Sequence, residues 1–481
     1  MPTFRVCSGM AESDFDFVVL GGGSGGYAAA RTAQAAGLKV AIIDGADELS
    51  GLCILRGCMP SKTLIESADR NLVIRRADEF GLQALAMGAD IRAIRDRKRR
   101  LVHEFASYRQ EQLEDGRWAL HRGHAAFKDK HSVEVTPRDG SAAFTVTSKT
   151  WCVATGSVAN VPPIPGLEET GFWTSDELLE AEDLPASFAI LGGGAIALEA
   201  AHYLEGVGRQ VTIIQRNQQL LTGLDRECSD VICNAYAKRG IESYCGTHVH
   251  RISRIETGKQ IDFSQGGAHH KIVVDEILVA LGRIPAIDGL NLHAAHVATL
   301  DGKKITVAPT MQTNQEHIFA AGDVCSVLDV VHVAIQQGEI AARNAHRLIL
   351  QQPLVEHMDH RLLLFGVFSH PQVAVVGAHE ADLTKQGIPF ITASYPFDDH
   401  GKSMVMGETA GFVKMLAHRE TGEILGGCCV GPHATELIHE VVVAMHHRCT
   451  VQTFLTIPHY HPTLSEIWTY PAEGCAEQLA K

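Results

Sequence analysis

Residues 14–26 read DFDFVVLGGGSGG, and this stretch decides the fold. Its apolar run to Leu20 predicts a buried strand, its glycines predict a tight turn, and the alanine-rich stretch to about Ala36 predicts a helix. Residues 40–43 predict a second strand, which ends at Asp44. A strand, a glycine loop, a helix and a strand that ends in a carboxylate form the dinucleotide-binding unit of a doubly wound sheet.

The positions of this loop have separate physical tasks. Gly21 permits the tight turn, Gly23 lets the backbone approach a pyrophosphate, and the N–H groups at the start of the helix bind its oxygens. Ser24 and Gly26 complete the loop. Asp44 follows at the distance where a carboxylate accepts hydrogen bonds from a ribose.

The same unit recurs further along the chain. Residues 188–191 predict a strand, GGGAIA at 192–197 predicts the turn, and residues 199–205 and 211–214 predict a helix and a strand. The candidate nucleotide-binding positions here are Gly192, Gly194 and Ala197. Two dinucleotide sites imply that electrons pass between two nucleotides, for which a flavin and a nicotinamide are the economical pair.

A pair of cysteines lies between the two units, in GLCILRGCMPSK at residues 51–62. The sulfurs of Cys53 and Cys58 can meet if the first lies just before a helix and the second lies in its opening turn. A thiolate at a helix N-terminus is stabilised by unpaired N–H groups and by the helix dipole. Arg56 and Lys62 add positive charge nearby. An arbitrary cysteine pair of this spacing would be two buried thiols, but its place about thirty residues after a nucleotide-binding loop and the Pro-Ser-Lys that closes it favour a redox-active disulfide.

These motifs together resemble the FAD-dependent pyridine-nucleotide disulfide oxidoreductases, and the resemblance runs from about residue 14 to the end of the chain. Gly57-Cys58-Met59-Pro60-Ser61-Lys62 matches the second half of the family's cysteine motif. The first half departs from it at Leu52, where Thr is usual, and at Leu55, where Asn is usual. The departures leave the potential of the disulfide open.

The resemblance implies catalytic roles for six residues. Cys53 would exchange with the substrate, Cys58 would face the flavin, and Lys62 with Glu199 would sit near flavin N5 and the nicotinamide. His461, in the His-Pro-Thr-Leu-Ser-Glu sequence of residues 461–466, would be the acid–base group that Glu466 orients. In the family this histidine comes from the other subunit, so a homodimer is implied.

The resemblance also implies further cofactor contacts. They are Thr155 and Gly156 where the chain leaves the flavin domain, Gly282 and Arg283 where it returns, and Gly322 and Asp323, of which the Asp would bond the FAD ribityl chain. Asp44 and Lys62 belong to the same set.

The choice between the two nicotinamide cofactors depends on the residues that end the strand predicted at 211–214. A carboxylate there would bind the 2′-OH of NAD and repel a 2′-phosphate, but this strand ends in the neutral Gln215 followed by the cation Arg216. In the resembled family, Ala197 at the third loop position also favours NADP. Residues 217–222 lack a second cation, however, so we favour NADPH and keep NADH as the alternative.

The expected fold is α/β, with two Rossmann-type domains, a central domain and a C-terminal α+β dimerisation domain. The expected boundaries are an N-terminal extension at 1–13, an FAD-binding domain with the redox disulfide at 14–160, an NAD(P)H-binding domain at 161–284, a central domain at 285–355 and an interface domain at 356–481.

The disulfide substrate has several candidates. His461–Glu466, residues 431–437 and His332 look like dihydrolipoamide dehydrogenase, which favours a lipoyl disulfide, free or on a carrier protein. Ser24 and Arg31 look more like glutathione reductase, where such an Arg meets a glutathione carboxylate, although Arg31 could equally be a solvated helix residue. Transhydrogenation and a mainly docking role as a subunit of a larger complex remain alternatives.

A mercuric reductase-like role is disfavoured. That enzyme carries a second cysteine pair in its C-terminal tail, whereas the tail here has Cys475 alone. The adjacent Cys428 and Cys429 lie in an apolar, strand-like run and are expected to be core thiols. No metal site is expected.

Composition excludes other classes of function. A net charge of −14 argues against a nucleic-acid surface, and the basic run at residues 92–100 is expected to be a solvated helical face. The sequence has no apolar run of membrane length and no signal-peptide pattern at its start. The twelve scattered cysteines favour a reducing, cytoplasmic setting over a disulfide scaffold.

Overall fold

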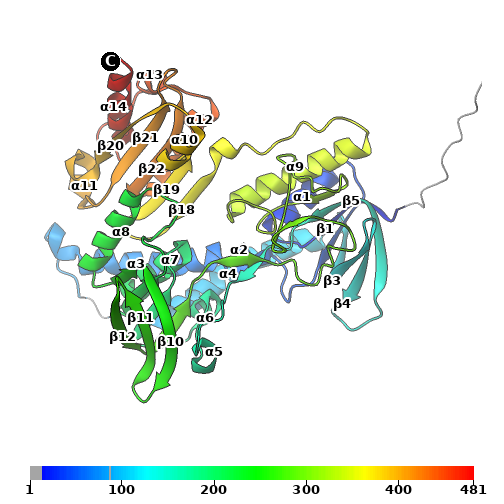
Figure 1. Cartoon of the computed structure of the whole chain (residues 1–481), viewed down its shortest axis with the longest axis horizontal. Coiled ribbons are helices and arrows are strands. Elements are labelled where there is room, and N and C mark those ends of the chain that lie inside the picture. Colours follow the sequence, from blue (N-terminus) through cyan, green and yellow to red (C-terminus); the bar gives the residue numbers. More distant parts are fainter. Residues whose placement is uncertain (1–12, 86–87, 481) are drawn as a thin grey trace, which may run out of the picture. The chain divides into compact units, whose positions relative to one another are not determined.

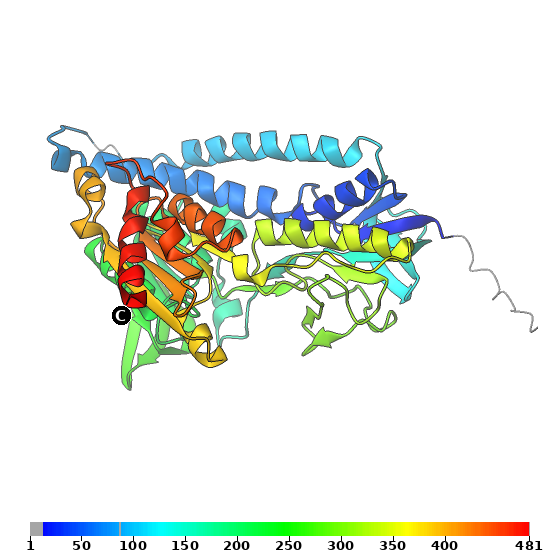
Figure 2. The ribbon, with the colours of Figure 1, turned by 90° about the horizontal axis from the view of Figure 1, so that it is seen from above.

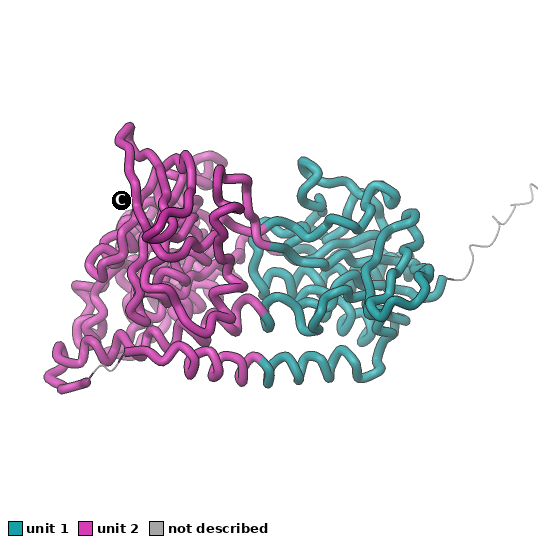
Figure 3. The backbone as a smooth tube through the Cα atoms, turned by 90° about the horizontal axis from the view of Figure 1, so that it is seen from below, with its two compact units in different colours: residues 1–55, 103–158, 284–358 teal, residues 56–102, 159–283, 359–481 magenta. Residues whose placement is uncertain are grey.

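The computed structural model describes residues 13–85 and 88–480, so residues 1–12 of the expected N-terminal extension lie outside the described residues. The chain divides into two compact units (Figure 3). Unit 1 contains residues 1–55, 103–158 and 284–358, and unit 2 contains residues 56–102, 159–283 and 359–481. The finer division into four domains stays a prediction.

Unit 1 is built on a parallel sheet of the doubly wound kind, in the order β3-β2-β1-β5-β17. Its strands are β1 (Phe15–Leu20), β2 (Val40–Asp44), β3 (Ala119–Asp129), β5 (Phe144–Val153) and β17 (Ile318–Ala320). β4 (Ser132–Pro137) pairs antiparallel with β3 and β5. The central strands are apolar without alternation because both faces of a parallel sheet are buried.

Two helices of unit 1, α1 (Ser24–Ala35) and α9 (Val331–Ile349), lie side by side (Figure 1). Glycine makes this close approach possible. A Cβ on Gly338 would lie 2.2 Å from the carbonyl oxygen of Gly25, and a Cβ on Gly25 would lie 3.0 Å from that of Ala334. The glycine loop that begins α1 is therefore held against a helix more than three hundred residues away in the sequence.

Unit 2 contains a second parallel sheet, in the order β13-β7-β8-β9. The strands are β7 (Ser187–Leu191), β8 (Gln210–Gln215), β9 (Glu242–Cys245) and β13 (Glu276–Val279), with helices α7 (Ala195–Gly206) and α8 (Arg226–Lys238). The long α3 (Cys58–Arg75) packs on α7, where the side-chain amide of Asn71 donates to the carbonyl of Gly206 at 2.7 Å. This packing brings the start of α3 toward α7.

Unit 2 also holds two antiparallel sheets. β10 (Thr247–Ile255), β11 (Gly258–Gln265) and β12 (Ala268–Val274) form a meander, which appears green in Figure 1. The C-terminal sheet has the order β18-β19-β22-β21-β20. Its strands are β18 (Leu364–Val367), β19 (Gln372–Gly377), β20 (Phe390–Pro396), β21 (Phe412–His418) and β22 (Ile424–Gly431), and α12 (Ala434–His446) and α14 (Thr469–Leu479) pack on it (Figure 2).

The remaining elements are short, apart from α4. They are α2 (Gly51–Leu55), α4 (Ile91–Glu114), α5 (Leu167–Thr170), α6 (Ser175–Glu180), α10 (Glu380–Gln386), α11 (Gly401–Met406), α13 (Val451–Phe454), β6 (Ser157–Ala159), β14 (Arg283–Pro285), β15 (Thr299–Leu300) and β16 (Lys304–Ile305), with 3-10 turns η1 (Ala77–Phe80), η2 (His360–Leu362), η3 (Phe397–Asp399) and η4 (Ser465–Trp468). Among the described residues, no helix combines the length and apolar character needed to cross a bilayer.

The basic run at residues 92–100 lies in α4 and is for the most part the expected solvated face, since Arg92, Arg97, Arg99 and Arg100 are exposed; Lys98 and Arg95 are the exceptions. Lys98 is 1% exposed and forms an ion pair with Glu180. Arg95 is also largely buried and pairs with Glu182 at 2.6 Å. The run therefore serves partly to anchor α4 on unit 2.

Candidate active site

The first glycine loop, at the end of β1, is tightly constrained. Gly21 has φ +102°, and a Cβ there would lie 2.5 Å from the carbonyl oxygen of Ala154. A Cβ on Gly26 would lie only 1.9 Å from the carbonyl oxygen of Gly21. Asp44, at the end of β2, contacts the same loop: its Oδ2 accepts a hydrogen bond from the Gly22 amide at 2.7 Å. The loop thus has the close strand–helix packing and the carboxylate that a dinucleotide site needs.

The second glycine loop repeats this geometry in unit 2. Gly192 has φ +123°, and a Cβ there would lie 2.2 Å from the carbonyl oxygen of Ala280. A Cβ on Gly194 would meet nothing within 4 Å, so the N-terminus of α7 faces open space where a pyrophosphate fits. Ala197, which replaces the third glycine, is fully buried.

Gln215 occupies the place in the second loop that Asp44 occupies in the first. A Cβ on Gly193 would lie 2.9 Å from Gln215 Nε2, just as a Cβ on Gly22 would lie 2.9 Å from Asp44 Oδ2. Gln215 is 7% exposed, and the Arg216 side chain beside it is exposed. The position where NAD-binding units carry an acid is therefore filled by a neutral amide.

The other predicted FAD-contacting residues lie where strands of unit 1 end. Thr155 donates its hydroxyl to the Ala286 carbonyl at 2.7 Å, and the Gly156 carbonyl accepts from the Ala286 amide. Asp323 Oδ2 accepts a hydrogen bond from the Ser157 hydroxyl. Gly322 is held by its amide, which donates to Gln337 Oε1 at 2.8 Å.

Gly282 and Arg283 lie where the chain returns from unit 2 to unit 1, at the end of the second segment of unit 2, residues 159–283. Gly282 has φ +91°, and its carbonyl accepts a hydrogen bond from the Asn160 amide at 3.0 Å. Arg283 begins β14. The two glycine loops have the backbone geometry of dinucleotide-binding loops, and the contact of Asp323 with the ribityl chain stays a prediction.

The two predicted redox cysteines belong to two different helices. Cys58 is the first residue of α3, which confirms the expected opening turn. Cys53, expected just before a helix, instead lies inside the short α2, because Gly51 at φ +78° starts a helical turn of its own. Both side chains are partly exposed. The boundary between the compact units falls between them, so Cys53 belongs to unit 1 and Cys58 to unit 2.

The surroundings of Cys53 in unit 1 include Arg109. The guanidinium of Arg109 stacks over the Tyr27 ring, 3.9 Å from its centroid. Burial lowers the pKa of Arg109, and electrostatic attraction to Tyr27 and Cys53 partly offsets this effect. Arg109 is therefore a half-buried cation in electrostatic contact with Cys53.

In unit 2, Lys62 and Glu199 form a close ion pair. Lys62 Nζ lies 2.9 Å and 2.8 Å from the two carboxylate oxygens of Glu199. The backbone amide of Phe368 also donates to Glu199, at 3.1 Å, and Lys62 Nζ stands 4.5 Å from the centroid of the Phe368 ring. The packing of α3 on α7 brings the pair together, and Phe368 fixes both partners.

His461 and Glu466 also meet in unit 2. His461 Nδ1 lies 2.9 Å from Glu466 Oε2, and the His461 side chain is 79% exposed. The other carboxylate oxygen of Glu466 lies 3.5 Å from Nε2 of the buried His400. Burial lowers the pKa of His400, which keeps this second imidazole mostly neutral. Glu466 thus binds one ring nitrogen of His461 and leaves Nε2 facing outward.

Arg31, the glutathione reductase-like residue, is engaged elsewhere. Its guanidinium lies 2.7 Å from Glu339 Oε1, and Glu339 also lies 3.6 Å from Arg343. The side chain of Arg31 is 50% exposed. It is therefore part of a charged network between α1 and α9.

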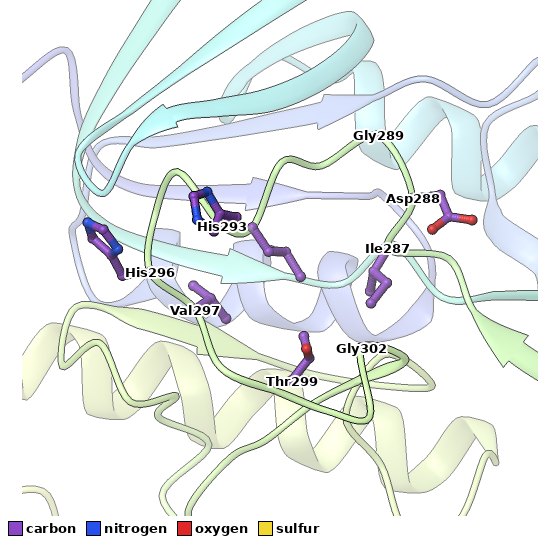
Figure 4. Close-up of a pocket in the computed structure, with 9 residues that line it drawn as sticks. Ile287, Asp288, Gly289, His293, His296, Val297, Thr299 and Gly302 are labelled. Carbon is purple, nitrogen blue, oxygen red and sulfur yellow. The ribbon is translucent and has the colours of Figure 1, made fainter.

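A pocket of about 550 Å³ lies in unit 1, outside the predicted site (Figure 4). Its lining comes from residues 287–302, including Asp288, His293 and His296. None of the predicted catalytic or cofactor-binding residues lines it. The pocket is therefore separate from the glycine loops and from the Lys62–Glu199 and His461–Glu466 pairs.

Family models cover nearly the whole of the described chain. Residues 15–338 match "Pyridine nucleotide-disulphide oxidoreductase", and residues 365–472 match the dimerisation domain of the same family. The chain belongs to the pyridine nucleotide-disulphide oxidoreductase family. This confirms the resemblance, the α/β fold with a C-terminal dimerisation domain, and the assignment as an FAD-dependent NAD(P)H:disulfide oxidoreductase.

Relatives of this oxidoreductase cover more than nine-tenths of its length. Dihydrolipoyl dehydrogenase of Bacillus subtilis (strain 168) is 33% identical over 94% of this chain and 96% of its own. Mercuric reductase of Staphylococcus aureus is 29% identical over 92% of this chain and 79% of its own. Among solved structures, LpdA from Mycobacterium tuberculosis has a TM-score of 0.84 at 26% identity, covering 95% of this chain and 99% of its own. The flavoprotein disulfide reductase RclA from Escherichia coli has a TM-score of 0.82 at 26% identity, covering 95% and 99%.

Several partners in the site of this oxidoreductase had no signal in the sequence. Phe368 and His400 each contact a residue that was predicted, but neither stands in a motif that we identified, whereas Ser157, which contacts Asp323, ends the segment that contains Thr155 and Gly156. Arg109 lies in a helix whose sequence reads as a charged surface. These contacts depend on the packing of distant segments.

Proposed function

We propose that this oxidoreductase uses NADPH to reduce a lipoyl-type disulfide, or runs that reaction in reverse, with Cys53 and Cys58 as its redox disulfide. When bound, FAD supplies the two-electron chemistry that links the nicotinamide to this disulfide. Asp44 and Asp323 would hold its ribose and ribityl hydroxyls, and the first glycine loop would hold its pyrophosphate.

The observation that carries the proposal is the His461–Glu466 pair. The carboxylate accepts a hydrogen bond from Nδ1–H and so holds the ring in one tautomer, and the exposed Nε2 can then give a proton to a departing thiolate and take it back. The outward position of His461 suits a disulfide on a second subunit, as expected for a homodimer held by the dimerisation domain.

The choice of a neutral lipoyl group over glutathione disulfide rests on Arg31. A residue that binds a glutathione carboxylate must be available to it, whereas Glu339 already pairs with the Arg31 guanidinium at 2.7 Å. Glutathione-like disulfides remain the second candidate because Arg109 supplies another cation in electrostatic contact with Cys53.

The choice of NADPH rests on Gln215. Because a neutral amide replaces the acid below the second glycine loop and Arg216 is exposed beside it, a 2′-phosphate meets no repulsion there. Lys62 and Glu199 would position the nicotinamide end of the same cofactor.

The test is steady-state turnover of the purified enzyme with lipoamide and with glutathione disulfide, each with NADH and NADPH. The proposal expects fast lipoamide turnover with NADPH and loss of all disulfide turnover in Cys53→Ser. Gln215→Glu should shift the preference toward NADH, and Asn217→Gln, on the exposed side of the same turn, is the matched control. Rapid flavin reduction without turnover of either disulfide would refute the substrate and leave the family unaffected.

A further inference from the structure

Three exposed histidines gather on one face of the meander β10–β12 in unit 2. They are His248 and His250 on β10 and His269 on β12. The rings of His248 and His250 have centroids 4.9 Å apart, and those of His250 and His269 are 5.4 Å apart. The predicted redox chemistry uses none of them.

The strand register explains why these side chains share a face. Ser264 on the central strand β11 is paired with His248 on one side and with His269 on the other. Residues directly opposite one another in an antiparallel sheet point to the same face. His250 is the extra residue of a bulge between Val249 and Arg251, and a bulge re-aims a side chain.

The hydroxyl of Ser264 holds the middle imidazole. His250 Nε2 lies 3.0 Å from Ser264 Oγ, and this hydrogen bond leaves Nδ1 free to act as a ligand. Metal-binding histidines commonly donate their other ring N–H to an oxygen in this way, which fixes the ring and its tautomer.

We infer that His248, His250 and His269 form a binding site for one divalent late transition-metal ion, such as Zn²⁺ or Cu²⁺. With metal–nitrogen distances of about 2.0–2.1 Å, two imidazoles on one tetrahedral ion have centroids roughly 5 Å apart. The observed separations of 4.9 and 5.4 Å match this spacing for the two pairs that include His250. His248 and His269 stand on the two strands that flank β11, about 9.5 Å apart at two strand spacings, so the three ring nitrogens do not yet converge in the structure. Both side chains are exposed, and rotation of their rings toward His250 would place three nitrogens on one ion.

Imidazole nitrogens favour zinc and copper over magnesium or calcium, and affinity increases from Zn²⁺ to Cu²⁺ at a given site. Three protein ligands leave a fourth position for water or an exogenous group. An acidic alternative, the cluster of Asp225, Glu227 and Glu380, is less suited to a metal ion because the buried ammonium group of Lys414 pairs with all three.

The test titrates the full-length holoenzyme, with its redox disulfide oxidised, with Zn²⁺ in competition with a chromogenic chelator. His250→Ala and the double variant His248→Gln/His269→Gln should each lose one bound ion or bind it more than about tenfold more weakly. Ser264→Ala should weaken Zn²⁺ binding by about tenfold, because His250 loses the hydrogen bond that orients its ring. Flavin absorbance per chain checks that each variant is folded.

His270→Gln is the matched control, since the neighbouring His270 stacks on Phe263 on the other face of β12. It should bind the ion as the unaltered enzyme does. The electron paramagnetic resonance spectrum of one equivalent of Cu²⁺ should show hyperfine splitting from three imidazole nitrogens. An unchanged number and affinity of ions in the variants, an equal loss in His270→Gln, or a spectrum without three nitrogens would overturn the inference.

Discussion

Removal of the charge on either member of the Lys62–Glu199 pair should slow hydride transfer from the nicotinamide cofactor to the flavin. The relevant variants are Lys62→Met and Glu199→Gln, which keep the approximate size of each side chain. In the structure Glu199 binds Lys62 through both oxygens and accepts the Phe368 amide as well. Each variant therefore releases the other member from its fixed position.

The size of the effect follows from the contacts. The side chains of Lys62 and Glu199 are 31% and 10% exposed, so the pair is only partly screened by water. A hydrogen bond to a charged group contributes about 1.5–3 kcal/mol, which corresponds to roughly a 10- to 150-fold change in rate. Because the two residues act as a unit, the double variant should be little slower than the slower single variant.

The assay is stopped-flow measurement of flavin reduction by NADPH, with flavin content per chain as the check on folding. The matched control is the pair Arg70 and Glu66 on the same helix, α3, whose side chains are 77% and 45% exposed. Such an exposed pair contributes about 0–1 kcal/mol, so Arg70→Gln and Glu66→Gln should leave the rate nearly unchanged. Strictly multiplicative effects of Lys62→Met and Glu199→Gln, or equal effects in the control pair, would refute the reasoning.

Three further predictions concern the acid–base pair, the first loop and the response to pH. Glu466→Gln should lower disulfide turnover about 10- to 100-fold because His461 loses its charged partner, while flavin reduction by NADPH is unchanged; equal turnover would contradict the role of the pair. Gly26→Ala should yield protein without flavin absorbance, because the new Cβ would lie 1.9 Å from the Gly21 carbonyl oxygen; a full complement of FAD would exclude this account. Burial lowers the pKa of His370 to about 4, so the unfolded chain binds the proton more tightly than the folded chain between about pH 4 and 6.5. Stability should therefore fall as the pH is lowered through that window, and His370→Asn should reduce the fall by at most about 3.4 kcal/mol in thermal unfolding scans, whereas an identical slope would disprove the assignment.

The sequence was most informative where chemistry depends on residues close together in the chain. The glycine loops, Asp44 and the Gln215 replacement all lie within single strand–loop–helix units, so spacing alone indicated their arrangement. The position of Cys53 was less predictable. Gly51 begins a separate helical turn, and no pattern in the sequence distinguished this short helix from an extended approach to α3.

Contacts between distant segments were not predictable from any local pattern. Phe368 reaches Glu199 from 169 residues away along the chain, and the packing of α3 on α7 determines where that amide lies. Lys98 was assigned to a solvated face because its neighbours are charged, yet it is buried against Glu180. A single sequence shows the charge of a side chain but not which element will cover it.

The adjacent Cys428 and Cys429 show how the fold decides the chemistry that a sequence leaves open. Successive residues of a strand point to opposite faces, so the two thiols enter different parts of the core. Cys428 lies 3.3 Å from the sulfur of Cys228 on α8, whereas Cys429 is buried in the core beneath the C-terminal sheet. Burial raises the pKa of Cys429, which keeps it in the unreactive thiol form. Because the two sulfurs point apart and both are buried, this vicinal pair is not arranged to bind one soft metal ion, as expected for core thiols.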